Sequence, residues 1–257
     1  MRKKVIAGLL VGVAMVSLVL TGCGNKKEAN KEITVSIAAS LQQPMDKIKD
    51  EFKKETGIDV NYNSGGSGTL KKQISQGANV DLFLSANTKY VDELVNEGLV
   101  NKDNVEDLLT NSLVVIGNKE NEKKLNNLDE LKNTNSKIGV GEISTVPAGQ
   151  YTKQTLENLK LWDSLKDKFI YAKSVTNVLN YVENGDVNYG FVYKTDAMNL
   201  KNSKIVYEVP NDYHQSIEYS LCLIKDSKNK KESKEFFDFL NSDTSKKIFK
   251  EYGFGVQ

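Results

Sequence analysis

Short apolar runs alternate with amphipathic segments along most of the chain. The run "ITVSIAAS" predicts a strand, and Met45, Ile48 and Phe52 follow it at the spacing of one helix face. The same order then recurs twice. The run "IDVNY" precedes a helix that starts near Ser67, and "VDLFLSA" precedes a helix that closes at Gly98.

Further strands are predicted, with helices between them, at "SLVVIG", "SKIGVG", "NYGFVY", "SKIVYEV" and "YSLCLIK". The C-terminal stretch "ESKEFFDFLNSDTSKKIFKEYG" predicts two consecutive helices. Strands that alternate with helices favour an α/β fold with largely parallel sheets. The length fits one large domain or two medium ones, and no Pro-rich or Ser-rich linker divides the body.

The N-terminus predicts export and a lipid anchor. Three basic residues precede an apolar run that ends in "LTGC", which is typical of a bacterial lipoprotein signal. We therefore expect a signal peptide over 1–22, a lipid on Cys23 and a polar tether over 23–30. A simple signal peptide with an incidental cysteine is the alternative.

Charge and cysteine content exclude several classes of function. The chain has 35 basic and 34 acidic residues, and the signal carries three of the basic ones, so no nucleic-acid footprint is expected. Besides Cys23 the only cysteine is Cys222, within the apolar "SLCLI", where we expect a core residue. The single histidine, His214, is predicted to be solvated in a polar loop. With so few cysteines and histidines, we do not expect a disulfide, a zinc cluster or a cysteine nucleophile.

Four predicted helix starts share small or hydroxyl-bearing residues. The loop in "NSGGSGTLKKQISQG" places Ser67 as an N-cap, and "AASLQQPM" places Ser40 at another start. The other two are "STVPAGQYT", with Ala148 and Gly149 in the first turn after Pro147, and "AKSVTNVL", with Ser174, Val175 and Thr176. First-turn N–H groups are free to bind an anion beyond the carboxyl ends of strands. With no charged capping residue, such a site would favour an anion without a proton.

These motifs resemble those of the molybdate-binding and tungstate-binding proteins of ABC transporters, which have the type II periplasmic-binding-protein fold. The resemblance spans nearly the whole mature chain, from "ITVSIAASL" through "GGSGTLKKQISQGANVDLFLSAN", "VGEISTVPAGQYTKQTLENL" and "YGFVYKTDA" to "KKIFKEYGFGVQ". It implies that Ser40 and Ser67 bind the oxyanion through hydroxyl and backbone N–H, Ala148 and Val175 through backbone N–H, and Tyr193 through its phenol. Compared with the family, the loop "GGSG" has fewer serines, and Asn87, outside the expected site, replaces an aspartate.

The resemblance also implies two lobes, each a mainly parallel sheet flanked by helices, with "SLVVIG" and "YSLCLIK" as the strands at two hinge crossings. The first lobe would cover 31–112 and 218–257, and the second 113–217. Ligand binding would then close a hinge between the lobes.

The sequence therefore predicts a monomeric lipoprotein, bound to the outer face of the cell membrane, that captures molybdate or tungstate and delivers it to an ABC-transporter permease. No cofactor and no metal cation is expected. Two alternatives stay open: a binding protein for another small anion, such as sulfate or an organic acid, and a serine hydrolase that uses His214 with Ser40 or Ser67. Neither a Gly-x-Ser-x-Gly elbow nor a phosphate-binding Gly-Lys-Ser/Thr loop is present, so an enzyme is not expected.

Overall fold

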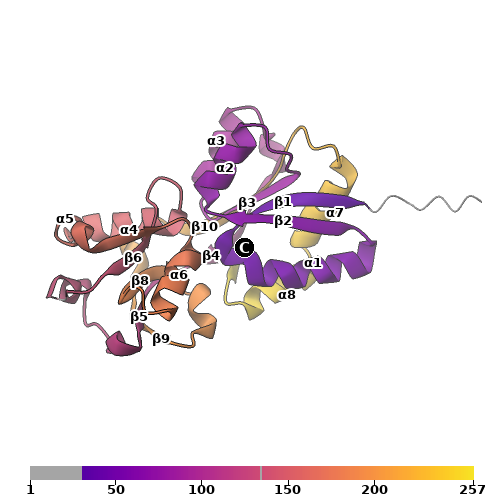
Figure 1. Ribbon diagram of the computed structural model, residues 1–257. Helices are drawn as coiled ribbons and strands as arrows, with labels where there is room; N and C mark the ends of the chain where they lie inside the picture. Colours follow the sequence, from indigo (N-terminus) through magenta and orange to yellow (C-terminus); the bar gives the residue numbers. More distant parts are fainter. Residues whose placement is uncertain (1–30, 134) are drawn as a thin grey trace, which may run out of the picture.

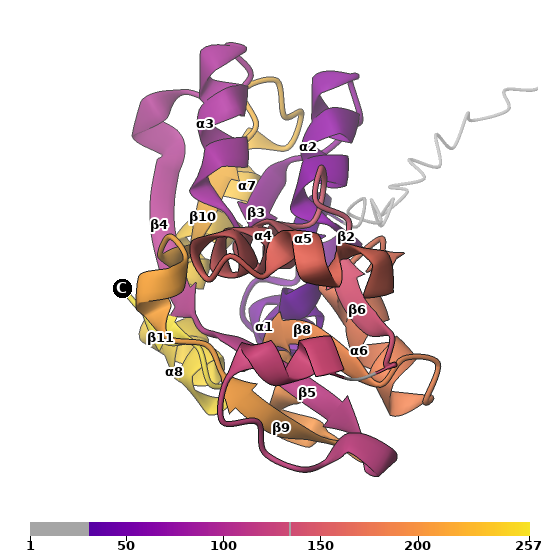
Figure 2. The same ribbon diagram turned by 90° about the vertical axis from the view of Figure 1, so that its left-hand side faces the viewer.

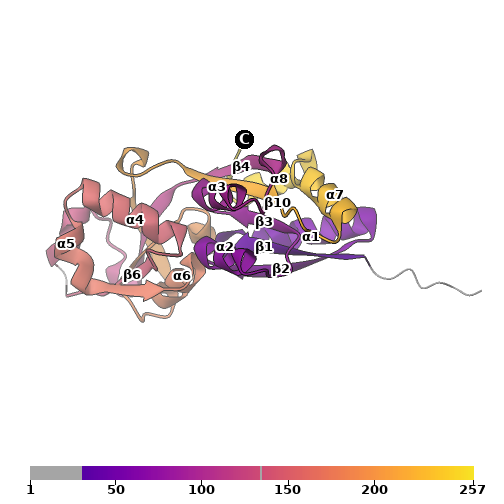
Figure 3. The same ribbon diagram turned by 90° about the horizontal axis from the view of Figure 1, so that it is seen from above.

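The computed structural model describes residues 31–133 and 135–257 as two lobes that lie side by side along the long axis of the molecule (Figures 1 and 3). Each lobe is one β-sheet covered by helices. The predicted signal peptide, Cys23 and the predicted tether lie outside the described residues.

The first lobe contains the six-stranded sheet, in the order β11-β4-β10-β3-β1-β2. Its strands are β1 (Glu32–Ala38), β2 (Asp59–Gly65), β3 (Leu82–Ser85), β4 (Val105–Asn111), β10 (Ile217–Leu223) and β11 (Gly255–Val256). Its helices are α1 (Gln42–Thr56), α2 (Ser67–Ser75), α3 (Thr88–Asn96), α7 (Lys230–Leu240) and α8 (Asp243–Glu251).

Successive side chains of the central strands point to opposite faces of this sheet and pack into a core on each face. On β3, Leu82 and Leu84 join the core under α1, α7 and α8, while Phe83 joins the core under α2 and α3. Cys222 on β10 is fully buried in that second core, which confirms its prediction as a core residue.

The second lobe contains the five-stranded sheet, in the order β7-β6-β8-β5-β9. Figure 2 labels β5, β6, β8 and β9 of this sheet. Its strands are β5 (Leu113–Asn118), β6 (Ile138–Gly141), β7 (Phe169–Ala172), β8 (Tyr189–Tyr193) and β9 (Ser203–Glu208). Its helices are α4 (Pro147–Asn158), α5 (Trp162–Leu165) and α6 (Val175–Glu183). Short 3-10 helices in the two lobes are Ala39–Leu41, Lys102–Asn104, Lys119–Asn121, Leu128–Asn133, Lys166–Lys168, Asp196–Asn199 and Asn211–Tyr213.

The α/β fold with two lobes is confirmed, but both sheets are mixed rather than mainly parallel. In the first sheet β1 pairs in parallel with β2 and β3, whereas β10 is antiparallel to β3 and β4. In the second, β6 is parallel to β7 and β8, whereas β5 is antiparallel to β8 and β9. Strands β5 and β10 each follow a lobe crossing, and a strand that arrives from the other lobe is not bound to the direction of a β-α-β repeat. The C-terminal strand β11 is also antiparallel to its neighbour β4.

The chain crosses between the lobes at two places. It leaves the first sheet after Asn111 and enters the second at Leu113, then returns after β9 to the first sheet at Ile217. The runs "SLVVIG" and "YSLCLIK" therefore lie at the crossings, and each forms a strand of one sheet. We propose 31–112 with 218–257 as the limits of the first lobe, and 113–217 as those of the second.

The helix starts agree with those predicted from the sequence, with one correction. Ser67 is the first residue of α2 and not its N-cap, because Gly66 occupies the cap position and no side chain caps the helix. Ser174 does cap α6 by accepting the N–H of Asn177, and Pro147 opens α4, where its missing N–H costs nothing. Strands β4, β7 and β11 are additions to the predicted elements.

Candidate functional site

The five residues that the sequence singled out line one small cavity between the two lobes. Ser40 and Ser67 come from the first lobe, and Ala148, Val175 and Tyr193 from the second. The space inside is about 10 Å³, roughly one water molecule in this measure, so the surrounding groups are closed around it. All five residues are buried.

The cavity lies where strand ends and helix starts of both lobes meet. β1 and β2 of the first lobe deliver Ser40 and the glycine loop before α2, while α4 and α6 of the second lobe begin at the cavity with Ala148 and Val175 in their first turns. Backbone N–H groups in a first helical turn have no acceptor within their helix, and the helix dipole makes that end positive. The arrangement therefore directs main-chain donors at the cavity.

The lining carries no charge. Besides the five residues it consists of alanine, glycine, valine and proline, and no described Lys, Arg, Asp or Glu side chain belongs to it. A larger groove of about 880 Å³ opens beside it and shares Ala39, Gly65 and Gly66 with its wall.

Ser67 is held so that its hydroxyl can donate into the cavity. Its Oγ accepts the backbone N–H of Ala86 at 3.0 Å, and its side chain is fully buried. Since the oxygen already accepts a hydrogen bond from the protein, the hydroxyl proton is left for a partner on the cavity side.

Tyr193 presents a buried hydroxyl without a partner. The residue is 1% exposed, and its Oη has no hydrogen-bond partner among the described residues. Burial raises the pKa of the phenol well above its ordinary value, so the group keeps its proton and acts as a donor. A buried polar group without a partner costs about 1–3 kcal/mol, so its position at a cavity points to a ligand that accepts its proton.

Asp196 contacts Tyr193, three residues earlier in the chain, but does not line the cavity. Its Oδ2 accepts the Tyr193 backbone N–H at 3.2 Å. Burial raises the pKa of the Asp196 carboxyl to about 7, although that hydrogen bond acts to lower it. The carboxyl is therefore neutral in mildly acidic solution and becomes charged near neutral pH.

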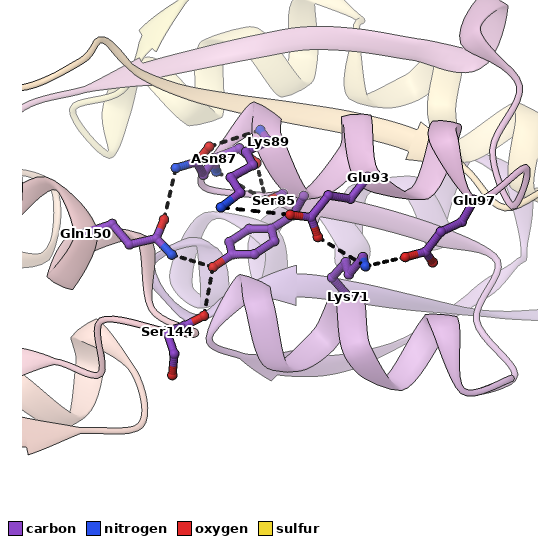
Figure 4. Close-up of polar contacts among 9 residues, drawn as sticks. Lys71, Ser85, Asn87, Lys89, Glu93, Glu97, Ser144 and Gln150 are labelled. Atoms are coloured by element: carbon purple, nitrogen blue, oxygen red, sulfur yellow. Dashed lines mark hydrogen bonds and ion pairs between the residues drawn. The ribbon is translucent and has the colours of Figure 1, made fainter.

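The lobes contact each other beside the cavity through a polar cluster (Figure 4). The side chain of Gln150 on α4 donates to Tyr90 Oη on α3 at 2.5 Å and accepts from Asn87 Nδ2 at 3.2 Å. The Tyr90 hydroxyl donates to the Ser144 carbonyl at 3.3 Å. Asn87, as expected, lies outside the cavity, but it also caps α3 and bridges the lobes.

Glycine in the loop before α2 is needed for this close approach. The Gly68 N–H donates to the Thr145 carbonyl of the second lobe at 2.9 Å. A Cβ at Gly68 would lie 2.7 Å from Tyr90 Oη and 2.8 Å from Thr145 Cα, where no real Cβ fits. The glycines of "GGSG" therefore let the lobes meet over the cavity.

The structure corrects the prediction for His214, which is buried and not solvated. It is 8% exposed, its Nδ1 lies 2.7 Å from the Gln215 carbonyl, and its ring packs against Tyr151 at 5.7 Å. The loop folds onto α4, which a polar sequence pattern does not reveal. His214 hydrogen bonds to neither Ser40 nor Ser67, so the described residues form no serine–histidine pair.

Two other kinds of site are absent from the described part of the chain. No group of three or more His, Cys, Asp or Glu residues is placed to hold a metal ion within 31–133 and 135–257. Over the same ranges, no helix combines the length and the apolar character needed to cross a bilayer.

Tyr219 is the residue near the site that sequence reasoning missed. Its Oη lies 2.9 Å from Ser40 Oγ, although Tyr219 does not itself line the cavity. It occurs in the apolar run of β10, where a tyrosine looks like any other core aromatic. Only the three-dimensional structure shows that its hydroxyl reaches a site residue.

We predict that Gly68→Ala keeps the lobes apart, because the added methyl collides with Tyr90 and Thr145. Small-angle X-ray scattering should show a larger radius of gyration than for the wild type. Gly77→Ala is the control: Gly77 has a φ of +88° and nothing within 4 Å of the added Cβ, so it strains the backbone far from the second lobe. Scattering curves of Gly68→Ala that match those of the wild type would contradict the role of this contact.

Comparison with known proteins agrees with this architecture. The family of bacterial extracellular solute-binding proteins matches residues 33–255. A Bacillus subtilis protein that is assigned by name to the ABC transporter substrate-binding lipoproteins is 40% identical, over 93% of this chain and 94% of its own. The molybdate-binding protein ModA of Escherichia coli is 37% identical, over 91% of this chain and 93% of its own.

A solved structure shows the same fold. The periplasmic molybdate-binding protein of Azotobacter vinelandii superposes with a TM-score of 0.79, covering 88% of this chain and 99% of its own at 23% identity. Together with the family match over residues 33–255, this leads to one conclusion: the chain belongs to the bacterial extracellular solute-binding proteins.

Proposed function

We propose that this protein captures molybdate or tungstate in the inter-lobe cavity and delivers it to an ABC-transporter permease. The observation that carries the proposal is the buried Tyr193 hydroxyl, which has no partner in the described protein and borders a cavity lined by uncharged donors. The names of two relatives that cover more than nine tenths of this chain support it: one binds molybdate, and the other is assigned to ABC transporters.

Neutral donors can hold a doubly charged anion in such a site. An ion removed from water without partners would cost tens of kcal/mol in a medium of low polarity. Hydrogen bonds to a charged group contribute about 1.5–3 kcal/mol each, and the starts of α2, α4 and α6 add favourable dipoles. In this proposal Ser40, Ser67 and Tyr193 donate hydroxyl protons, and Ala148 and Val175 donate backbone N–H groups.

The same donors discriminate between anions according to whether the anion itself carries a proton. Phosphate carries a proton near neutral pH, and that proton would need an acceptor which the uncharged lining does not offer. Sulfate has no such proton, so it is the competing ligand, and only the size of the closed cavity separates it from the larger molybdate and tungstate. A sulfate-binding function therefore remains the second candidate.

Binding without a fixed cation also suits transport. Two lobes that meet through hydrogen bonds can separate at the crossings near Asn111 and Ile217, and the anion then loses the donors of one lobe. We infer that the protein binds and releases its ligand unchanged and is not an enzyme.

The chain functions outside the cytoplasm, as members of its family do. We further propose that a lipid on Cys23 anchors it to the outer face of the cell membrane, that residues 23–30 are the tether, and that the protein is a monomer. The "LTGC" motif and the lipoprotein assignment of the Bacillus subtilis relative support the anchor.

Tyr193→Phe should weaken molybdate binding and leave the ligand-free protein at least as stable as the wild type, because the lost hydroxyl has no partner within the described protein. The loss of one donor to a charged ligand costs about 1–3 kcal/mol, or roughly 5- to 150-fold in affinity. Isothermal titration with molybdate, tungstate, sulfate and phosphate measures it. Undiminished affinity in the variant, or tight binding of phosphate by the wild type, would refute the proposed site.

The affinity should also depend on pH through Asp196. Since the carboxyl ionises as the pH rises through about 7, its negative charge beside Tyr193 then opposes the bound anion. We expect molybdate affinity to fall roughly 10-fold between mildly acidic and mildly basic pH, and to stay nearly constant in Asp196→Asn. If molybdate affinity depends on pH equally in the wild type and in Asp196→Asn, Asp196 is not the group responsible.

Lipidation is tested by labelling cells with a radioactive fatty acid. The wild type should incorporate label and remain with the membrane fraction, whereas Cys23→Ala should not be labelled, since the modified sulfur is gone. Cys222→Ala is the matched control, because Cys222 is buried in the first lobe and should have no effect on labelling. Equal labelling of Cys23→Ala and the wild type would exclude the anchor.

A further inference from the structure

A chain of hydrogen bonds leads from Ser40 to three residues that do not line the cavity. Ser40 Oγ is 2.9 Å from the Oη of Tyr219, a fully buried residue of β10. Asn111, the last residue of β4, places its Nδ2 3.2 Å from the same Oη and 2.9 Å from Thr195 Oγ1. The chain thus joins the candidate site to the first crossing between the lobes.

The amide of Asn111 has only one consistent orientation. Its Oδ1 accepts the Ser112 backbone N–H at 2.9 Å, which a nitrogen at that position could not do. The amide nitrogen therefore faces Thr195 and Tyr219, and its two protons are donated to these two hydroxyl oxygens. Asn111 acts as a donor toward Tyr219.

The direction of the next bond follows from the single proton of Tyr219. Its oxygen already accepts from Asn111, and burial raises the pKa of the phenol well above its ordinary value, so the proton stays on. If Ser40 also donated to this oxygen, the phenolic proton would be buried without an acceptor, which is strongly unfavourable. Tyr219 therefore donates to Ser40.

We propose that Asn111 and Tyr219 fix Ser40 as a hydrogen-bond donor toward the cavity and thereby make the site reject anions that carry a proton. Since the Ser40 oxygen accepts from Tyr219, its own proton is directed to the ligand. Without Tyr219 the hydroxyl could rotate and accept a proton from the ligand instead. This inference rests on the proposed anion-binding function and identifies two specificity-determining residues that do not line the cavity.

Ser67 offers a useful contrast. Its oxygen accepts from a backbone N–H, that of Ala86, so no side-chain substitution can reverse that bond. The donor character of Ser40 depends on two side chains and can be changed by mutation. The chain of hydrogen bonds that leads from Ser40 is thus the place where selectivity against protonated anions can be tested.

The test compares phosphate with sulfate, two tetrahedral anions that differ in whether they carry a proton near neutral pH. Titration calorimetry gives the ratio of their dissociation constants for wild type, Tyr219→Phe and Asn111→Asp. The second variant keeps the size of the side chain, but its carboxylate accepts the Tyr219 proton, so Ser40 must donate to Tyr219 and turns its lone pair to the cavity. In both variants we expect the phosphate-to-sulfate ratio to fall about 5- to 10-fold.

Tyr62→Phe is the matched control. It also removes a tyrosine hydroxyl from a hydrogen bond, to the Met45 carbonyl at 2.8 Å, but within the first lobe and away from the cavity. Its phosphate-to-sulfate ratio should equal that of the wild type. A variant with a merely structural defect would weaken the binding of both anions by the same factor and leave the phosphate-to-sulfate ratio of dissociation constants unchanged.

The outcomes separate the two claims. If the wild type binds sulfate or molybdate but the ratio is the same in Tyr219→Phe and Asn111→Asp as in the wild type, the assigned hydrogen-bond direction is wrong, and the proposed function stands. The same holds if Tyr62→Phe shifts the ratio as much as the other two variants. If the wild type binds no oxyanion at all, the proposed function fails, and the selectivity role fails with it.

Discussion

The cavity between the lobes is lined by no charged side chain, so an anion in the proposed site must be held by hydrogen-bond donors alone. One helix start supplies too few N–H groups, so helix starts from two lobes have to meet around the same small space. Ser67 at the start of α2 then faces Ala148 and Val175 at the starts of α4 and α6. The Ser67 oxygen accepts the Ala86 N–H, and by the direction inferred above the Ser40 oxygen accepts from Tyr219, so both hydroxyl protons are left for the ligand.

The same constraint explains the contact between the lobes. Donors from opposite lobes can reach one anion only if the backbones come together, and Gly68 permits this by lacking a Cβ beside Tyr90 and Thr145. The polar contacts of Gln150 with Tyr90 and Asn87 hold the lobes in this position (Figure 4). Hydrogen bonds of this kind contribute modestly to stability, so the lobes can also separate, as release of a ligand requires.

Local sequence patterns predicted much of this arrangement, because strand periodicity and helix starts are local properties. Ser40 and Ser67 were found from such starts, which also pointed to the segments around Ala148 and Val175. The family resemblance singled out these two residues and Tyr193, since a strand-end tyrosine has no distinctive local pattern. The burial of His214, the antiparallel strands at the crossings and the link from Tyr219 to Ser40 depend on contacts between distant segments. The cap of α2 was missed because serine and glycine are both favoured at that position.

The most direct test of the account is a crystal structure of the mature protein with molybdate, with the metal located by its anomalous scattering. The account predicts one tetrahedral oxyanion between the lobes, with its oxygens within hydrogen-bond distance of Tyr193 Oη, the Ser40 and Ser67 hydroxyls and the backbone nitrogens of Ala148 and Val175. A molybdate bound elsewhere, or one held between the lobes by a lysine or arginine side chain, would contradict it.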